Sequence, residues 1–226
     1  MDGFLLIDKP EGITSHDVVD RLRRLTGIRR IGHAGTLDPF ATGLLIVGVG
    51  RGATKRLSEI MGKEKTYDAT AVLGATSVTQ DRTGTITETE SEKVRKWPEE
   101  SAVREAMAGF VGPQKQVPPM FSAKKIAGKK LYELARAGLE VERKPADITI
   151  HALELLRYAP PILSFRVRCS SGTYVRTLAH DLGHALGTGA YLEALRRTAI
   201  GEYRVENAAE LAALTPENWQ KALFAL

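Results

Sequence analysis

The sequence predicts an α+β protein. Residues 44–49 are apolar almost throughout, which is typical of a strand buried on both faces. Residues 66–73 and 162–169 alternate apolar and polar side chains, as strands with one buried face do. Residues 15–26 and 174–186 carry apolar side chains at helical spacing. Strands and helices do not alternate regularly along the chain, so a doubly wound parallel sheet is not expected.

The composition is that of an ordinary globular chain. Of its 226 residues, 43% are hydrophobic and 26% are charged, and the formal net charge is +5. This length can enclose a substantial core, and the positive charge permits a polyanionic partner without requiring one. One cysteine, Cys169, excludes an internal disulfide. With no signal peptide and no apolar run of membrane-spanning length, we expect a cytoplasmic monomer with a single domain over residues 1–226.

The first elements lead into a glycine-rich loop. Residues 4–7 are apolar and predict a short buried strand. Ser15 is expected to cap the helix that follows, and Gly27 to end it. Basic side chains gather at the end of this helix and just beyond it: Arg21, Arg23, Arg24, Arg29 and Arg30. They suit the helix dipole, so a solvated basic face is the simple interpretation, but they also suggest a path for phosphates.

Residues 32–43 read Gly-His-Ala-Gly-Thr-Leu-Asp-Pro-Phe-Ala-Thr-Gly. Gly32 and Gly35 allow a ligand to approach the backbone closely. Pro39 fixes its own backbone and restricts Asp38 before it. The sequence therefore predicts a stiff Asp38 at the lip of a buried strand, with space before its carboxylate. An isolated Asp-Pro pair would more often be a simple turn.

A second glycine-rich segment invites a different interpretation. Residues 48–53 read Gly-Val-Gly-Arg-Gly-Ala after the predicted buried strand and before a predicted helix, as in a dinucleotide-binding fingerprint. Asp68 lies at about the right distance to bind a ribose. However, Asp68 begins the next predicted strand instead of ending it, and no alternating strand–helix pattern follows. A nucleotide-dependent oxidoreductase is therefore only a minor alternative.

The later segments supply further candidates. Tyr67 faces inward at the start of a predicted strand, which also suits an ordinary core tyrosine. Residues 116–145 break the core pattern with prolines, exposed apolar residues and many lysines, and predict an insertion over a groove, with a short basic helix at residues 129–137. Arg176 falls in the first turn of a predicted helix, where the dipole disfavours a cation, so it requires an anionic partner. His180 and His184 have metal-ligand spacing, but no third ligand is evident, and we expect no metal.

Six motifs stand out along residues 3 to about 205. They are Asp8-Lys9-Pro10-x-Gly12, the Gly32–Gly43 loop, Lys65-x-Tyr67, Gln116-Val117-Pro118-Pro119-x-Phe121-Ser122-Ala123, Gly128-Lys129-Lys130-x-Tyr132 and Gly172-Thr173-Tyr174-Val175-Arg176-Thr177. In order and in register, these motifs resemble the bacterial TruB family of tRNA pseudouridine synthases, which act on the T-loop uridine numbered 55.

This resemblance implies a pseudouridine synthase fold, with a mixed, largely antiparallel sheet, flanking helices and a central catalytic cleft. It places Asp38 on the family's catalytic aspartate, Tyr67 on its active-site tyrosine and Arg176 on the arginine that pairs with the aspartate. His33 matches the histidine that holds the target base out of its loop. Tyr174 and Leu195 match residues that line the uridine pocket.

The resemblance also implies how RNA is held. Residues 116–145 correspond to the family's thumb-like RNA-binding segment. The expected RNA contacts are Lys9, Arg29, Arg30, Lys124, Lys129 and Lys130. Two departures from the family are noted: Val78 stands where an aspartate is common, and we expect this chain to lack the family's usual C-terminal PUA domain.

The expected reaction breaks the bond between N1 and C1′ of uridine and re-forms it at C5, with no net redox change and no cofactor. A carboxylate can attack the sugar or the base, or stabilise a cation-like sugar, and the base must first be flipped out of its loop. The alternatives are a non-catalytic tRNA-binding or folding helper, a guide-RNA-dependent relative and, least favoured, the oxidoreductase.

Overall fold

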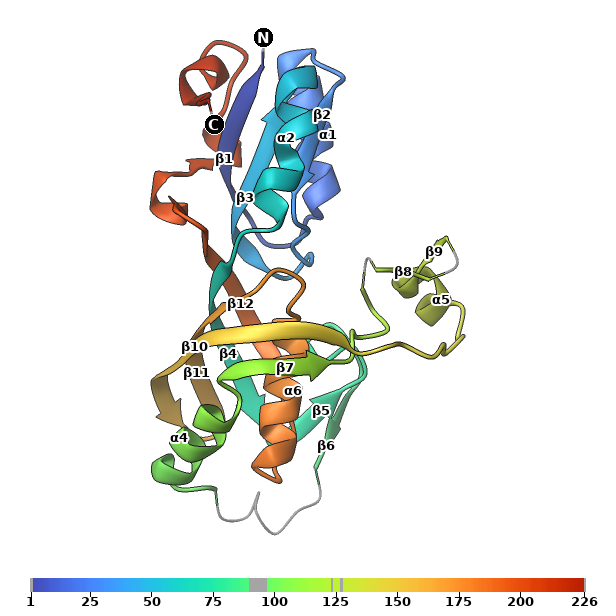
Figure 1. The fold of residues 1–226 in the computed structure, drawn as a ribbon, viewed down its shortest axis with the longest axis vertical. Helices are drawn as coiled ribbons and strands as arrows, with labels where there is room; N and C mark the ends of the chain where they lie inside the picture. Colours follow the sequence, from blue (N-terminus) through green and yellow to red (C-terminus); the bar gives the residue numbers. More distant parts are fainter. Residues whose placement is uncertain (1, 90–96, 123, 127, 226) are drawn as a thin grey trace. The chain divides into compact units, whose positions relative to one another are not determined.

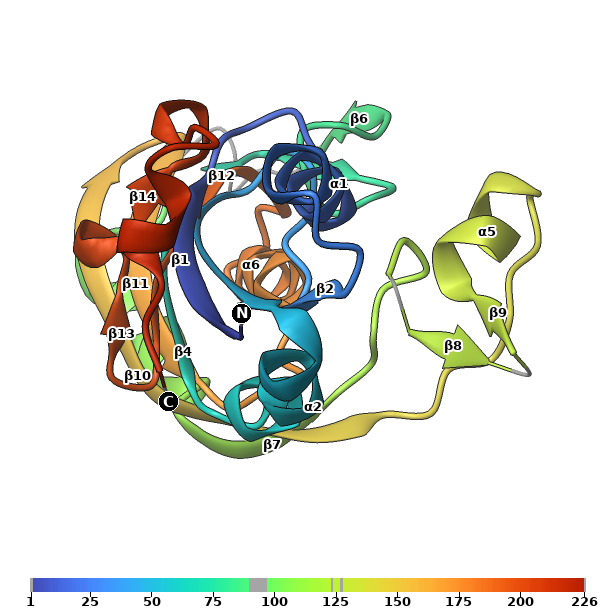
Figure 2. The ribbon, with the colours of Figure 1, turned by 90° about the horizontal axis from the view of Figure 1, so that it is seen from above.

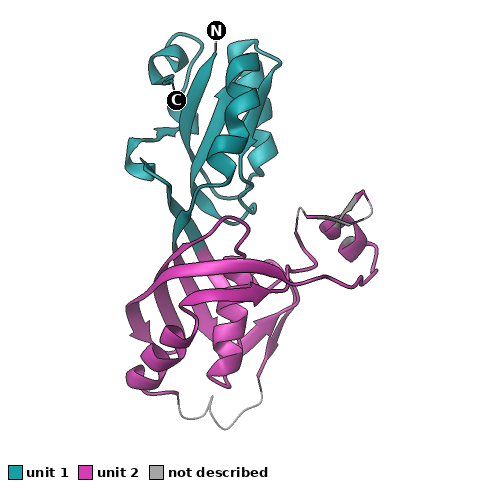
Figure 3. Cartoon of the chain, in the orientation of Figure 1, with its two compact units in different colours: residues 1–67, 195–226 teal, residues 68–194 magenta. Residues whose placement is uncertain are grey.

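The computed structural model describes residues 2–89, 97–122, 124–126 and 128–225. The chain forms two compact units, residues 1–67 with 195–226 and residues 68–194 (Figure 3). Two strands, β4 (Lys65–Leu73) and β12 (Ala190–Ile200), contain the boundaries between them. The single domain expected over residues 1–226 stays a prediction.

The first unit holds the elements nearest the two chain ends, which are coloured blue and red in Figure 1. Besides its parts of β4 and β12, it comprises β1 (Gly3–Lys9), α1 (Ser15–Thr26), β2 (Ile31–Ala34), β3 (Thr42–Val49), α2 (Gly50–Met61), β13 (Tyr203–Arg204), η1 (Val205–Asn207), β14 (Ala209–Glu210), η2 (Leu211–Ala213) and η3 (Trp219–Ala222). Its strands follow the order β14-β1-β3-β12-β4, with β2 paired to β3 and β13 paired to β12.

Strand β3 is the centre of this unit. It pairs with β1 in antiparallel fashion along one edge. The other edge is shared by two strands: β2 pairs antiparallel with residues 46–49, and β12 pairs parallel with residues 42–43. The loop between β2 and β3, which carries Asp38, therefore leaves the sheet where β2 ends and β12 takes over.

The two helices cover opposite faces of β3. Leu45 and Val47 pack in one apolar cluster with Val18 and Leu22 of α1. Leu44 and Ile46 pack in a second cluster, with Ala53, Leu57 and Ile60 of α2. Burial on both faces explains why the sequence of β3 is continuously apolar, and it confirms the strand predicted over residues 44–49.

The expected cap of α1 was displaced by one residue. Thr14, and not Ser15, is the N-cap, and it forms a capping box with Asp17 in which each side chain accepts the other residue's backbone N–H. Gly27 ends the helix in the left-handed conformation, as predicted. The Ser15 side chain is therefore available for a different contact, described below.

The second unit is built on long antiparallel strands. It contains its parts of β4 and β12 together with β5 (Ala75–Ser77), β6 (Ile86–Glu88), α4 (Glu100–Gly109), β7 (Gly112–Gln116), β8 (Lys125–Ile126), β9 (Lys129–Lys130), α5 (Leu131–Arg136), β10 (Ala146–Ala159), β11 (Ile162–Cys169) and α6 (Val175–Ala185). Its main strands follow the order β12-β4-β11-β10-β7. Because β10 is antiparallel to both β11 and β7, and helices accompany the strands, the α+β class is confirmed.

In β4 and β11, alternate side chains are buried, as the sequence predicts. Tyr67 is buried in β4, and every second residue of that strand is buried with it. Cys169 is buried at the end of β11.

The insertion at residues 116–145 stands apart from the other elements of its unit, with α5, β8 and β9 at its end (Figure 2). Its helix is shorter than predicted, because Lys129 and Lys130 pair in β9 with β8 and the helix begins at Leu131. Ala123 and Ala127 lie outside the described residues.

Candidate active site

The backbone on both sides of Asp38 is held by hydrogen bonds from the β1–α1 segment. Before Asp38, the buried Ser15 hydroxyl accepts the Leu37 N–H at 2.8 Å and contacts the Leu37 carbonyl as donor at 3.2 Å. After it, the Pro39 carbonyl accepts the Gly12 N–H at 2.8 Å. The Ala41 N–H also closes a turn onto the Asp38 carbonyl at 3.1 Å. Asp38 itself is half-buried on a backbone with little freedom.

Lys9 supports the same loop from inside the protein. Its side chain is wholly buried, and its ammonium group donates to the carbonyls of Pro10 and Ile13 at 2.8 Å each and of Pro39 at 3.3 Å. Burial lowers the pKa of Lys9 to about 8, against the attraction of the Asp38 carboxylate, which raises it. The expectation that Lys9 contacts RNA is therefore wrong, because its donors are used inside the protein, where a phosphate does not reach.

A second buried cation, Arg197 of β12, holds the two ends of the loop. Its side chain is 1% exposed, and its Nε donates to the Leu44 carbonyl at 2.7 Å while Nη2 donates to the Gly35 carbonyl at 3.1 Å. Sequence reasoning did not identify this residue. The signal was present, because Leu195, Arg197 and Ala199 are the inward positions of one alternating strand.

Gly43 makes this close contact with β12 possible. It lies opposite Arg197 in the parallel register and has a φ of +102°. A Cβ atom at this position would lie 2.3 Å from the Arg197 carbonyl oxygen and 2.8 Å from its nitrogen. Only glycine fits here, for reasons of both space and backbone conformation.

His33 lies on β2, where the loop begins. Burial lowers its pKa first, followed by charge interactions with Arg197 and then with His16, while the Gly35 backbone acts in the opposite direction. Its Nδ1 is buried and has no hydrogen-bond partner among the described residues. At neutral pH this side chain is therefore an uncharged ring.

Arg176 lies in the second unit and is 3% exposed at the start of α6. Its Nη1 donates to the Thr79 carbonyl and its Nη2 to the Phe121 carbonyl, both at 2.7 Å. Nη1 also lies 3.4 Å from a carboxylate oxygen of Asp81. The anionic partner that its position demands is thus supplied, at least in part, by Asp81, which sequence reasoning did not single out.

Asp81 is itself fixed by the loop that carries it. It is 4% exposed, and its Oδ1 accepts hydrogen bonds from the Thr79 hydroxyl at 2.7 Å and from the Thr83 N–H and hydroxyl at 2.9 and 2.5 Å. The Thr177 hydroxyl of α6 donates to the Gln80 side chain. Arg176 is consequently held by a loop that is bonded to its own helix.

Tyr174 is positioned by Gln116, at the end of β7. The buried Gln116 amide accepts the Tyr174 N–H at 2.8 Å and donates to the Tyr174 carbonyl at 3.1 Å. These two hydrogen bonds resemble the pair that neighbouring strands exchange, except that one partner here is a side-chain amide. It fixes the backbone at the beginning of α6, next to Arg176.

The predicted site residues therefore fall into two groups. His33, Asp38, Tyr67 and Leu195 belong to the first unit, where Tyr67 and Leu195 are buried on β4 and β12. Tyr174 and Arg176 belong to the second. The pairing of Arg176 with Asp38 stays a prediction.

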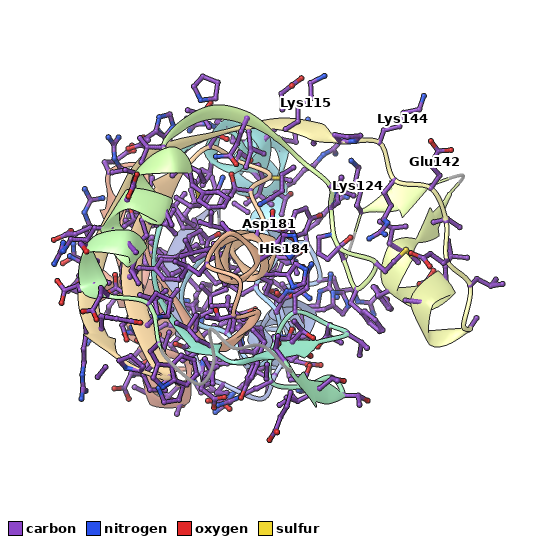
Figure 4. All side chains as sticks on the ribbon, turned by 90° about the horizontal axis from the view of Figure 1, so that it is seen from below. Lys115, Lys124, Glu142, Lys144, Asp181 and His184 are labelled. Carbon is purple, nitrogen blue, oxygen red and sulfur yellow. The ribbon has the colours of Figure 1, made fainter. Side chains whose placement is uncertain are left out.

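Most of the remaining residues predicted to bind RNA lie at the surface. Arg29, Arg30 and Lys124 are exposed. Figure 4 shows Lys124 and Lys144 along the insertion and Lys115 on the adjoining strand β7. The side chains of Lys129 and Lys130 lie outside the part of the structure that is described.

In the second glycine-rich segment, backbone N–H groups at the N-terminus of α2 already donate to acceptors of the protein itself. At the start of α2, the Gly52 N–H donates to the Asp2 carboxylate at 2.8 Å, and the Gly50 N–H donates to the Arg30 carbonyl at 2.7 Å. A diphosphate would need these donors. The oxidoreductase alternative is therefore wrong in its structural premise.

The described residues contain no group of three or more His, Cys, Asp or Glu side chains arranged to hold a metal ion. None of their helices is long and apolar enough to cross a membrane.

Comparison with solved structures identifies the fold. A chain from "Crystal Structure of a Cbf5-Nop10-Gar1 Complex" superposes with a TM-score of 0.71 at 28% identity, over 97% of this chain and 56% of that one. A chain from "Structure of H/ACA RNP bound to a substrate RNA containing 2'-deoxyuridine" gives a TM-score of 0.69 at 26% identity, over 97% and 55%. This chain thus spans little more than half of those solved chains.

Sequence comparison identifies the class and then the family. Residues 23–175 match the N-terminal domain of the TruB family pseudouridylate synthases, and residues 176–224 match the C-terminal domain of tRNA pseudouridylate synthase B. The tRNA pseudouridine synthase B of Opitutus terrae is 50% identical over 95% of this chain and 87% of its own length. That of Syntrophotalea carbinolica is 47% identical over 100% and 74%. The fold is that of a pseudouridine synthase, and the chain belongs to the TruB family.

Proposed function

We propose that this enzyme converts uridine to pseudouridine in the T-loop of tRNA, at position 55, and that Asp38 performs the chemistry. The observation that carries the proposal is the support of Asp38, whose backbone is fixed on both sides by Ser15, Gly12 and Lys9. A catalytic carboxylate benefits from such preorganisation, because the cost of orienting it is met during folding. The tRNA substrate agrees with the names of the relatives.

The reaction needs a nucleophile and a proton carrier but no redox partner. The bond between N1 and C1′ breaks, C1′ bonds to C5, and the proton on C5 leaves while N1 gains one. Asp38 supplies the carboxylate, which attacks either the sugar at C1′ or the base at C6. Both routes conserve atoms and electrons without a cofactor.

Other residues would serve this carboxylate and the base. Tyr67 would stack on the pyrimidine and relay the proton that leaves C5. Arg176 would pair with Asp38 and keep it ionised in a cleft that excludes water. The uncharged ring of His33 would occupy the space left by the flipped uridine, and Tyr174 and Leu195 would line its pocket.

The exposed basic residues would hold the tRNA backbone. Arg29 and Arg30 extend from the end of α1, and Lys124 lies on the insertion. Phosphate contacts of this kind position an RNA without reading its sequence, and binding through them weakens as salt is added. We propose that the enzyme acts as a cytoplasmic monomer on the T-arm.

The decisive experiment uses an unmodified T-arm transcript and the purified protein, with no added guide RNA. Pseudouridine is expected at position 55 and at no other uridine. Asp38→Asn, which retains the shape of the side chain but not its charge, is expected to abolish product while changing tRNA affinity by less than about threefold. Product made by Asp38→Asn at the normal rate would contradict the assignment of Asp38.

The same experiment separates the alternatives. A non-catalytic tRNA-folding helper would leave the transcript unmodified in both the wild type and Asp38→Asn. A guide-dependent enzyme would give product only after a guide RNA is added. Modification by the wild-type protein alone excludes both as the sole role.

A further inference from the structure

The buried guanidinium of Arg197 bridges two carbonyls at opposite ends of the loop that carries Asp38, and we propose that Arg197 is a positioning residue for Asp38. This inference rests on the proposed function, since it assumes that Asp38 acts on the substrate. The Arg197 side chain is 1% exposed, and we assign it no contact with the substrate. It would act through the backbone of residues 35–44.

The geometry of the bridge is specific. The donors Nε and Nη2 belong to one rigid planar group, so the Leu44 and Gly35 carbonyls that they bind at 2.7 and 3.1 Å are held at a set separation. Residues 36–43 lie between these two points and include the turn at Asp38. Fixing both ends of a loop removes most of the freedom with which its middle could shift.

The backbone of Arg197 reinforces its side chain. Its residue pair in the β12–β3 register is Gly43, where the absence of a Cβ lets the two backbones approach. Arg197 therefore contacts this end of the loop twice: its main chain lies opposite Gly43, and its side chain donates to the Leu44 carbonyl.

Burying this charge must have a reason beyond packing. Arg197 has no carboxylate partner among the described ion pairs, and the buried ammonium of Lys9 is close enough for the two cations to repel. A neutral side chain of similar volume would avoid this cost, and buried charges are often replaceable by apolar residues without loss of stability. What an apolar residue cannot do is bind both carbonyls.

The two cations also shape the potential at Asp38. The Asp38 carboxylate attracts the ammonium of Lys9, and Lys9 in turn lies within the field of Arg197. Positive charge on the inner side of the loop favours an ionised carboxylate on it. Arg197 itself would contribute to Asp38 through geometry, by binding the two carbonyls.

The test compares Arg197→Met, which keeps an unbranched side chain but removes the donors and the charge, with Arg197→Lys, which keeps the charge but not the planar fork. We expect the single-turnover rate on the T-arm transcript to fall about 100-fold for Arg197→Met and about tenfold for Arg197→Lys. The dissociation constant of the tRNA should change by less than about threefold in both variants.

A matched control accounts for lost stability. Leu22→Ala opens a cavity beneath α1, on a side chain that is fully buried and makes none of the contacts to the loop. Measured below the melting temperature of every variant, Leu22→Ala should retain the wild-type rate even if it unfolds as easily as Arg197→Met. An equal loss of rate in Leu22→Ala would overturn the proposal, because general destabilisation would then suffice.

Titration of His33, followed by NMR, reports whether the charge at position 197 has been removed. Besides burial, Arg197 and the exposed His16 lower the pKa of His33, and the Gly35 backbone raises it. In Arg197→Met the His33 imidazole, followed by NMR of its labelled ring carbon, should titrate at a higher pH than in the wild type. In Arg197→Lys it should stay near the wild-type value.

The outcomes separate this inference from the proposed function. If the wild type makes no pseudouridine, the proposed function fails and the loop has no catalytic aspartate to position. If the wild type is active and Arg197→Met matches its rate, or loses activity only through weaker tRNA binding, the positioning role fails alone. Should Arg197→Met not fold, Arg197→Lys decides by the same comparison of rate with affinity.

Discussion

Asp38 in the first unit and Arg176 in the second are both fixed, but their supports act at different points. Around Asp38, the described contacts from Ser15, Gly12 and Lys9 reach the backbone of the neighbouring residues. Around Arg176, the contacts from the Thr79 and Phe121 carbonyls and from Asp81 reach the guanidinium itself.

This difference follows from what each group is proposed to do. A nucleophile must bring its own atoms to the substrate, and for Asp38 the contacts named above make the backbone of its loop rigid. An electrostatic partner only has to present a charge at a set place, so gripping the charged group itself is an advantage. The two regions thus show two ways of preorganising a charge, by fixing the chain and by fixing the side chain.

The largest effect should come from substituting Arg176, whose guanidinium group is held directly. In Arg176→Lys a point charge replaces a planar fork that now meets two carbonyls and a carboxylate, so few of these contacts can be kept. We expect the single-turnover rate to fall by about 10² to 10³-fold. A wild-type rate would show that the grip on the guanidinium has no catalytic purpose.

The next largest effect should come from Gly43, at the end of the loop that carries Asp38. Gly43→Ala would place a methyl group against the Arg197 backbone in a conformation that L-residues rarely adopt. We expect a loss of about 3 kcal/mol in the free energy of unfolding, measured by urea denaturation.

Gly27→Ala is the matched control for this substitution. Gly27 also has positive φ, but nothing lies within 4 Å of its added Cβ. Strain alone should cost about 1 kcal/mol there. Equal losses at the two glycines would mean that the approach of β12 to the loop is unimportant.

A smaller effect is expected from the support of Arg176. Asp81→Asn retains the shape of the side chain but removes the charge that faces Nη1 at 3.4 Å. The rate should fall by about tenfold to 100-fold, because Arg176 keeps its two carbonyl partners.

Asp68→Asn provides the comparison for Asp81. Asp68 also faces an arginine, Arg166, through two hydrogen bonds of 2.6 and 2.8 Å, but this pair lies at the surface of the second unit. Its loss should change the rate by less than about twofold, since surface ion pairs contribute little. If both variants behave alike, the burial of Asp81 has no special role.

The smallest effect is the pH dependence produced by Lys9. The native state releases the Lys9 proton near pH 8, whereas the unfolded chain keeps it to about pH 10.5, so between these values the unfolded state binds more protons. The contribution of Lys9 to stability should therefore increase with pH in this window, by at most about 1.4 kcal/mol per pH unit. Urea denaturation at pH 7, 8 and 9 would measure it.

Lys9→Met isolates this contribution from the other groups that titrate in the same range. The difference in unfolding free energy between the wild type and Lys9→Met should be constant below pH 8 and shift in favour of the wild type above it. A difference that does not change with pH would show that Lys9 is not a buried ammonium.

The fold was predictable where the side-chain pattern is local. The continuous run at residues 44–49 and the alternation at residues 162–169 each depend on one strand and its immediate neighbours, and both strands were predicted correctly. The cap of α1 was misplaced because Thr14 and Ser15 are both good capping residues, and the choice between them depends on the contact of Ser15 with Leu37.

The supports of the site were not predictable in the same way. Arg197 meets Leu44, and Arg176 meets Thr79, only after distant segments have come together. A lysine that follows a strand, like Lys9, is far more often solvated than buried, and nothing local reveals the three carbonyls that surround it. Asp38 and Arg176 themselves were identified because their motifs resemble a known family.

The exchange of neighbours along the edge of β3 has a consequence for protein engineering. Because β2 ends at Ala34 and β3 begins at Thr42, residues 35–41 contribute none of the ladder on which the sheet depends. Added or deleted residues there would alter the tip and leave the anchoring carbonyls in place, at an entropic cost that grows slowly with length. The two ends of the loop are therefore fixed, and the segment between them can be exchanged for other sequences.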